Sequence, residues 1–259
     1  MVMISFTTLT AIAIAGALAQ TVFAAPSEKR AASCTFPNPK PLTDVKFSAP
    51  RVIPAGTIFD GKNLRYHRGV KCGGGVEGGN KDAVFLLDAG ATLQNAVIGA
   101  QQNEGVHCKG PCTIRNVWFE HVCEDAITLR QSSGTSTITG GGAKNAADKV
   151  VQHNGGGLVK IDSYCVQNFG KLYRSCGSCR TQVKRQVQIS NIIARNGKVL
   201  AGVNSNYGDV ATINTKSNSY TGVKSICNTY RGSTSSSEPP LLTENKANAK
   251  YVHMLSDSC

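Results

Sequence analysis

Short runs of β-branched and aliphatic residues recur along the chain, separated by Gly, Asn, Ser and Thr. One series of similar runs occupies residues 91–99, 112–119, 136–139, 158–161, 186–192 and 210–213. A second series lies between them, at residues 105–107, 125–129, 149–151, 171–173 and 199–203. The apolar spacing of three and four residues that predicts an amphipathic helix is scarce, so the pattern favours short strands throughout.

Both strand series advance by roughly 20–28 residues, which is the range of solenoid repeats. Two or three strands per repeat, without helices between them, predict an all-β fold, a single-stranded parallel β-helix (β-solenoid). A two-sheet sandwich is the alternative, but it would need hairpin turns that the two interleaved series do not supply. Asn95, Asn116 and Asn191 fall at the same place in their repeats, where asparagine suits a left-handed corner.

The beginning of the chain has a different character. Residues 1–24 carry an apolar run without charge and end in small residues, which is typical of a secretory signal peptide. Residues 25–48 form an N-terminal segment, in which Lys29-Arg30 offers a processing site after Arg30. The solenoid domain is expected over residues 49–259, with a C-terminal tail from about residue 215. No later segment is long and apolar enough to span a membrane, so a secreted protein is predicted.

The ten cysteines all follow the predicted signal peptide. An even number in an exported chain favours disulfides, although the sequence does not fix their pairing. Zinc binding by Cys108 with Cys112, or by Cys176 with Cys179, is the alternative, but no His or carboxylate partners accompany them. We expect Cys34, with residues 40–54, to hold a cap at one end of the solenoid. Cys227 and Cys259 are expected to do so at the other end.

The net charge of +12 indicates an acidic partner. A single Trp and the absence of a basic run disfavour nucleic acid. An anionic lipid surface and an acidic polysaccharide remain as candidate partners, and a positive charge that only aids solubility is the alternative. We expect the protein to act as a monomer.

A column of charged residues is predicted when the second strand series is aligned on its apolar positions, Val106, Ala126, Val150 and Leu172. Residues of equal phase stack at the interstrand spacing of about 4.8 Å. The alignment places Glu104, Glu124 and Asp125 together on one outer face, and the next coils continue the column with Asp148, Lys149, Lys171 and Arg174. A solvated surface of mixed charge is the alternative, but it does not explain three carboxylates beside three cations.

Three carboxylates on one face suit a hard cation, and Ca²⁺ fits them better than zinc. The adjacent cations suit an anionic substrate such as a uronic acid polymer. In such a polymer, a lysine or an arginine removes the C5 proton and the C4–O bond breaks by β-elimination. That role requires a lowered lysine pKa, which we expect burial and neighbouring cations to supply. Hydrolysis needs two carboxylates set apart, and the Gly-His-Gly arrangement of polygalacturonases is missing around His107.

Several longer motifs resemble the small pectate lyases of polysaccharide lyase family 3, which fungi and oomycetes among other microbes secrete. They occupy residues 59–62, 104–108, 122–126, 140–143, 148–152, 170–176 and 202–209, within a resemblance from about Ala49 to Asn214. The resemblance implies a right-handed β-helix, calcium dependence and trans-elimination on polygalacturonate or low-methyl pectin. A catalytically inactive pectin-binding protein and a polygalacturonase-type hydrolase are the alternatives.

The resemblance also implies roles for individual residues. The calcium positions are Glu104, where the family often has Asp, with Glu124 and Asp125. The remaining implied roles are the following: Lys149 as base, Arg174 as its charge-neutralising partner, Lys171 as holder of a substrate carboxylate, Asp148 as the group that orients Lys149, and Arg130 as a substrate-binding cation. Which of Lys149, Lys171 and Arg174 is the base remains open at the level of sequence.

Overall fold

The computed structural model describes residues 31–40, 44–73, 77–246 and 257–258. The predicted signal peptide and the processing site after Arg30 lie outside these residues. In chain order the strands are β1 (Val45–Lys46), β2 (Arg51–Ile53), β3 (Ile58–Asp60), β4 (Arg65–His67), β5 (Ala83–Leu87), β6 (Thr92–Ile98), β7 (Glu104–Cys108), β8 (Thr113–Phe119), β9 (Asp125–Leu129), β10 (Thr135–His153), β11 (Gly157–Asp162), β12 (Cys165–Ser175), β13 (Arg185–Ser190), β14 (Ile193–Asn204), β15 (Val210–Ile213), β16 (Ser219–Tyr230), β17 (Leu241–Lys246) and β18 (Asp257–Ser258). Two short 3-10 helices, η2 (Asn80–Asp82) and η3 (Ser205–Tyr207), interrupt them.

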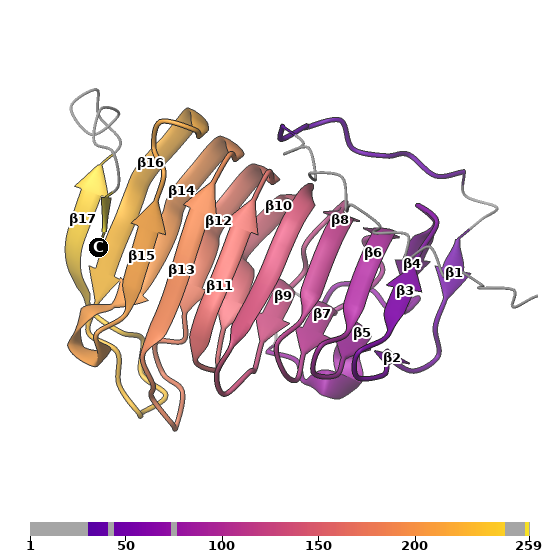
Figure 1. Cartoon of the computed structure of the whole chain (residues 1–259), viewed down its shortest axis with the longest axis horizontal. Coiled ribbons are helices and arrows are strands. Elements are labelled where there is room, and N and C mark those ends of the chain that lie inside the picture. Colours follow the sequence, from indigo (N-terminus) through magenta and orange to yellow (C-terminus); the bar gives the residue numbers. More distant parts are fainter. Residues whose placement is uncertain (1–30, 41–43, 74–76, 247–256, 259) are drawn as a thin grey trace, which may run out of the picture.

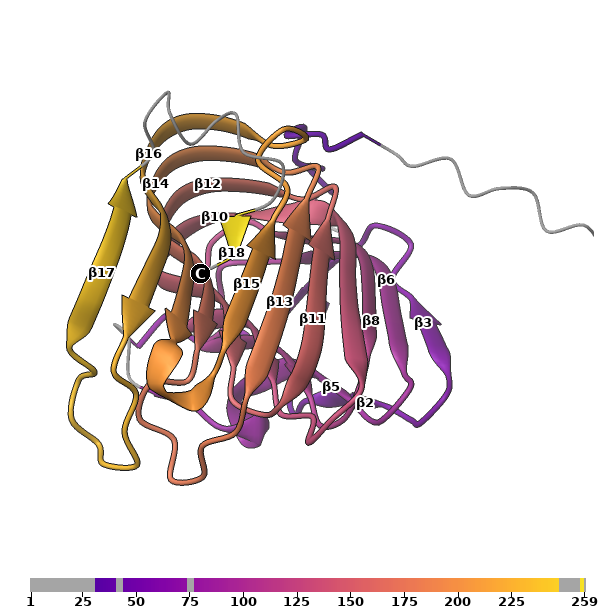
Figure 2. The ribbon, with the colours of Figure 1, turned by 60° about the vertical axis from the view of Figure 1, so that its left-hand side comes forward.

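The strands wind into coils that stack along one axis (Figure 1). Each strand pairs in parallel with the equivalent strand of the next coil, as in β7 with β9 and β11 with β13. Among the strands of the described residues, only β17 and β18 pair antiparallel, at the C-terminal end, and Figure 2 shows β17 running against β16 there. The predicted parallel β-helix is therefore confirmed, and the sandwich is excluded because it would need antiparallel neighbours throughout.

Three faces form each coil, and several long strands bend from one face to the next. We call the face that carries the charged column the site sheet. It consists of β2, β5, β7, β9 and the ends of β10, β12, β14 and β16. The second sheet contains β3, the beginnings of β6, β8 and β10, and then β11, β13 and β15. The third sheet contains the segments between them.

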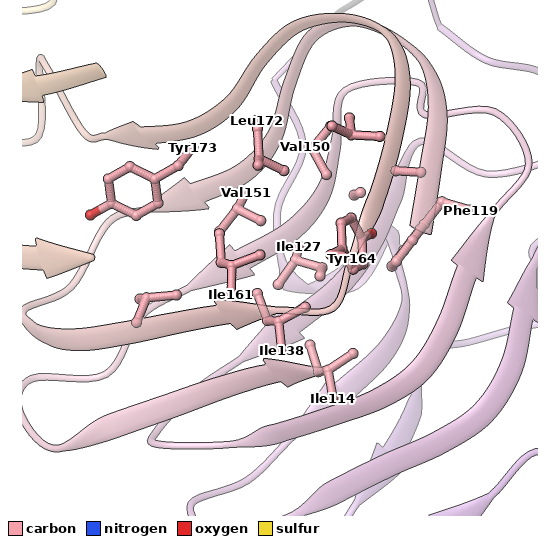
Figure 3. Packing of buried hydrophobic residues seen from close by; sticks show 14 of the residues in the cluster. Ile114, Phe119, Ile127, Ile138, Val150, Val151, Ile161, Tyr164, Leu172 and Tyr173 are labelled. Carbon is pink, nitrogen blue, oxygen red and sulfur yellow. The ribbon is translucent and has the colours of Figure 1, made fainter. Parts of the chain in front are cut away.

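Stacked apolar side chains fill the inside of the coils. Ile114, Ile138 and Ile161 occupy equal positions in three successive coils and lie one above another in Figure 3. All three are fully buried, as are Ile127 and Val151 of the site sheet. Full burial of such a side chain contributes about 1.5–3 kcal/mol, so each coil is stabilised by its neighbours rather than by itself.

Asparagines make the sharp corner between the second and third sheets. Asn95, Asn116 and Asn191 have φ angles of 51°, 52° and 53°, which confirms the predicted left-handed corner. The Asn116 side chain donates to Asn95 Oδ1 at 2.9 Å, so the amides bond from coil to coil. The next corner, between the third sheet and the site sheet, repeats this arrangement with Asn145, Asn168 and Asn196.

The N-terminal segment runs along the outside of the third sheet. The Cys34–Cys165 disulfide fixes it to β12, and the Phe36 ring packs edge-on against Trp118 at 4.8 Å. Cys34 therefore does not cap the end of the solenoid as expected; it joins the middle of the outer surface. Phe47 covers the core at the N-terminal end, where it contacts Tyr66 and Phe85.

Disulfides account for the described cysteines, as the even count predicts. The remaining bonds are Cys72–Cys123, Cys108–Cys112 and Cys176–Cys179, so neither close cysteine pair is a zinc site. Cys227 is disulfide-bonded too, whereas Cys259 lies outside the described residues. No helix in the described part of the chain has the length and apolar character needed to cross a membrane.

Candidate active site

A segment before β5 folds over the first coils of the site sheet. The Cys72–Cys123 disulfide fixes it beside the start of β9, and the Gly78 N–H donates to Glu104 Oε1 at 2.9 Å. His107 lies 3.2 Å from the other oxygen of Glu104 and 2.9 Å from Asn80 Oδ1. Glu104 and His107 are both buried, and Glu104 has a partner at each of its carboxylate oxygens.

The carboxylates of Glu124 and Asp125 lie at the start of β9, beside this segment. Both side chains are buried, and Asp125 pairs directly with Lys149 of the next coil. Lys149 Nζ lies 3.3 Å from Glu124 Oε1 and 3.5 Å from Asp125 Oδ1. The structure therefore brings two of the three predicted acids, Glu124 and Asp125, into direct contact with the predicted base.

Asp148 connects the two lysines of the column. Its Oδ2 lies 2.5 Å from Lys149 Nζ, and its Oδ1 accepts from Lys171 Nζ at 2.8 Å. Lys149 and Lys171 occupy paired positions of β10 and β12, so their Cα atoms are neighbours across the sheet. Asp148 thus holds both ammonium groups at the open edge of the acid cluster, in contact with Lys149 as its predicted orienting role requires.

Glu77 belongs to the same cluster, although no pattern in the sequence predicted it. Its carboxylate is a neighbour of Glu124 and raises the pKa of that group, and its charge also acts on Asp125. The segment that carries it is fixed by Cys72, whose partner Cys123 directly precedes Glu124. Knowledge of that disulfide would have revealed Glu77, but the pairing cannot be deduced from the sequence.

Carboxylates outnumber ammonium groups in this site, and the pKa values of two of the carboxyl groups are raised. Burial raises the pKa of Asp125 well above its ordinary value, and the charges of Glu104, Glu124 and Glu77 add to that effect. Burial and Glu77 raise the pKa of Glu124 in the same way. For Asp148, burial acts upward but the ammonium groups of Lys149 and Lys171 outweigh it, so its pKa is lowered.

The predicted lowering of the Lys149 pKa is wrong for the protein as the structure shows it. Burial does act to lower the pKa, but the carboxylates of Asp125, Asp148 and Glu124 outweigh it and raise the pKa. The neighbours that the prediction relied on were cations, whereas those that contact Lys149 are carboxylates. The Lys149 ammonium is therefore held in its charged form until some of that negative charge is neutralised.

The register of the predicted column is wrong by one residue in its first coil. The structure pairs Val106 with Ile127, so Glu104 lies level with Asp125 rather than with Glu124. Gly105 takes the position that the alignment gave to Val106. A Cβ on Gly105 would lie 2.2 Å from the Ala126 carbonyl oxygen, so only glycine fits there. The same shift places His107, not Cys108, level with Thr128, Gln152 and Arg174.

Arg174 and Arg130 lie further from the acids. Arg174 is buried at the end of β12, where its Nη1 donates to Asn204 Oδ1 at 2.8 Å and its guanidinium stacks on Tyr230 at 4.0 Å. Burial lowers its pKa. Arg130 is exposed and follows β9 at the end opposite Asp125, so the structure does not bring it into the cluster.

The residues of the cluster fit a divalent cation by their charge and by one buried oxygen that accepts no hydrogen bond. Among the described residues, no three His, Cys, Asp or Glu side chains already surround a single point as metal ligands do. However, Asp125 Oδ1 is buried without a hydrogen-bond partner, and Glu124 and Glu77 share its surroundings. Carboxylate oxygens are the ligands that Ca²⁺ prefers. The fold and the site together define a β-solenoid protein with a carboxylate and lysine site on one outer face.

Comparisons with known proteins agree with this description. A family model described as pectate lyase matches residues 34–237. Pectate lyase E of Emericella nidulans is 56% identical over 214 residues, which is 82% of this chain and 81% of that protein. Probable pectate lyase D of Neosartorya fischeri is 52% identical over 225 residues, 86% of this chain and 92% of that protein. The chain belongs to the pectate lyase family of enzymes, which confirms the resemblance seen in its motifs.

Solved structures show the same fold. The catalytic domain of pectate lyase PelI from Erwinia chrysanthemi superposes with a TM-score of 0.64 at 29% identity. The match covers 79% of this chain and 94% of that domain. PelI has also been solved in complex with tetragalacturonic acid, and that structure matches with a TM-score of 0.62 over 76% of this chain and 65% of PelI.

Proposed function

We propose that this enzyme cleaves polygalacturonate, or low-methyl pectin, by calcium-dependent β-elimination outside the cell. The observation that carries the proposal is the contact of Lys149 with Glu124, Asp125 and Asp148 on the site sheet. The solved complex of a structural neighbour with tetragalacturonic acid supports the substrate class. Four disulfides among the described residues support an oxidising, extracellular location.

Glu124 and Asp125 would hold the calcium ion, with Glu77 as a third carboxylate. Glu104 would contribute its charge, because both of its oxygens already have partners within the protein. When bound, calcium neutralises these carboxylates and that of the substrate, which makes the C5 proton more acidic. Neutralisation of its neighbours also removes the charges that raise the pKa of Lys149.

Lys149 then accepts the C5 proton in its neutral form. Lys171 binds the substrate carboxylate from the neighbouring coil, and Asp148 positions both amines. Arg174 assists as a fixed positive charge: it is buried, bonded to Asn204 and stacked on Tyr230, which suits it less for proton transfer than Lys149. Arg130 is exposed just after β9 and outside the cluster, so its proposed substrate-binding role rests on the resemblance alone.

The test is the appearance of an unsaturated uronate, followed by its ultraviolet absorbance on polygalacturonate with calcium and with chelator at alkaline pH. Lys149→Ala should lower kcat at least about 100-fold, as loss of a general base does. Lys160→Ala removes an exposed lysine of the second sheet and serves as the matched control, with kcat unchanged. Circular dichroism should show that both variants keep the fold.

Other outcomes would reject the proposal. Reducing ends without unsaturated product would identify a hydrolase. Binding of polygalacturonate without any new chain ends would identify an inactive pectin-binding protein. An elimination rate that the chelator does not lower would be consistent with the proposed substrate. It would reject the proposed role of calcium at Glu124 and Asp125.

A further inference from the structure

The charged column does not end at Lys171; it continues into the two coils that follow. Phe169 pairs with Gly197, which in turn pairs with Val223 of the following coil. Lys171 pairs with Val199, which in turn pairs with Ser225. The residues between these pairs, Gly170, Lys198 and Lys224, therefore occupy equal positions in successive coils. Towards the N-terminus the same position holds Asp148, whose backbone lies against Gly170. The column is acidic at one end and changes to basic beyond Gly170.

A surface hollow of about 430 Å³ lies along this basic part of the column. It crosses four long strands, β10, β12, β14 and β16, which bend side by side in Figure 2. Its floor is made by small residues, Ala146, Ala147, Gly170 and Gly222, which leave the space open. Ala147 and Gly170, which line the hollow, directly precede Asp148 and Lys171 in the sequence. The hollow therefore adjoins the candidate active site.

The two lysines that line this hollow are exposed, and neither belongs to any ion pair found among the described residues. No acidic side chain lines the hollow with them. Surface lysines usually have little effect alone, but these repeat once per coil at about 4.8 Å. An unesterified polyuronate carries one carboxylate per sugar, so successive sugars can meet successive coils.

We propose that Lys198 and Lys224 form an anion-binding extension of the substrate site that takes carboxylates of further sugars in an unesterified uronate chain. This inference rests on the proposed function for its polymer, but its binding step does not require catalysis. The extension recognises charge, so it favours longer chains and chains with free carboxylates. It takes no part in bond cleavage.

The experiment uses the full-length chain with Lys149→Ala, so that binding is measured without turnover. Migration is followed in gels containing polygalacturonate and compared with gels containing fully methyl-esterified pectin. Adding Lys198→Glu and Lys224→Glu should weaken retardation by polygalacturonate about tenfold in apparent affinity. Adding Lys160→Glu and Lys216→Glu makes the same charge change at exposed positions outside the hollow and should leave most of the retardation.

Kinetics of the otherwise native enzyme separate this inference from the proposed function. Lys198→Glu with Lys224→Glu should raise KM for the polymer about tenfold, with kcat and the KM for trigalacturonate unchanged. An equal loss of binding in the control pair, or an unchanged KM for the polymer, would overturn the extension. If the native enzyme yields no unsaturated product, the proposed function fails, whereas the gel result still decides the extension.

Discussion

Lys149 shows how one side chain depends on its neighbours for its chemical role. Three carboxylates lie within 3.5 Å of its Nζ, and they hold the proton that a base must lose. Two of the three, those of Glu124 and Asp125, belong to the proposed cation site, so we expect cation binding there to remove part of the negative charge that holds this proton. A lysine among cations, as the sequence suggested, would have been ready without calcium.

His153 is a buried residue with no part in the proposed chemistry, and it predicts a pH effect on stability. Its Nδ1 lies 2.8 Å from the Tyr173 hydroxyl and its Nε2 lies 3.1 Å from the Gly156 carbonyl oxygen. Burial lowers its pKa to about 4. The unfolded chain therefore binds a proton at His153 between about pH 6.5 and pH 4, while the folded protein does not.

The free energy of unfolding should consequently fall as pH drops through this window, by about 3 kcal/mol from His153 alone. Urea unfolding at pH 7 and at pH 4 measures the change. His153→Gln should flatten the pH dependence over the same window, whatever its stability at pH 7. An equally steep fall in the variant would show that other groups carry the effect.

At the scale of the element, the hydrophobic pattern was sufficient for the coils but not for their alignment. The apolar runs predicted the parallel pairing of β7, β9 and β10, because inward side chains must stack on one another. The register of β7 was missed because Gly105 occupies an inward position, where the Ala126 carbonyl leaves no room for a side chain. Glu77 was missed because it comes from outside the strands, on a segment fixed by a disulfide.

The asparagine corners allow the backbone and the side chain to be tested separately. Asn116 has a φ of 52°, accepts from Trp118 Nε1 at 2.9 Å and donates to Asn95. Asn116→Ala should lower the free energy of unfolding by about 1–3 kcal/mol, because it loses these hydrogen bonds and a longer one to Asn63 and strains the left-handed backbone. Asn116→Gly loses the bonds without the strain, so it should cost about 1 kcal/mol less in chemical denaturation. Equal losses in the two variants would show that the left-handed backbone has no cost here.

At the scale of the molecule, disulfides attach to the solenoid those segments that do not pack into its stacked core. A solenoid coil contacts only its neighbours, so a segment that crosses several coils needs another attachment. The segment around Phe36 rests on Val97, Trp118 and Cys165, a small cluster separate from the main core. The Cys34–Cys165 bond joins this segment to a coil 131 residues later, whereas Cys176–Cys179 spans only 3.

This contrast predicts unequal effects on stability. Chain entropy in the unfolded state makes the longer loop worth about 3 kcal/mol more than the shorter one. Replacing Cys34 and Cys165 together by Ala should therefore lower the free energy of unfolding by about that much more than replacing Cys176 and Cys179 by Ala. Chemical denaturation of both double variants measures the difference. The rate of unsaturated product formation should be unchanged by the first pair, because the segment covers the third sheet and the carboxylates lie on the site sheet. Equal stability losses would show that native packing of the segment, rather than loop closure, sets the contribution of the bond.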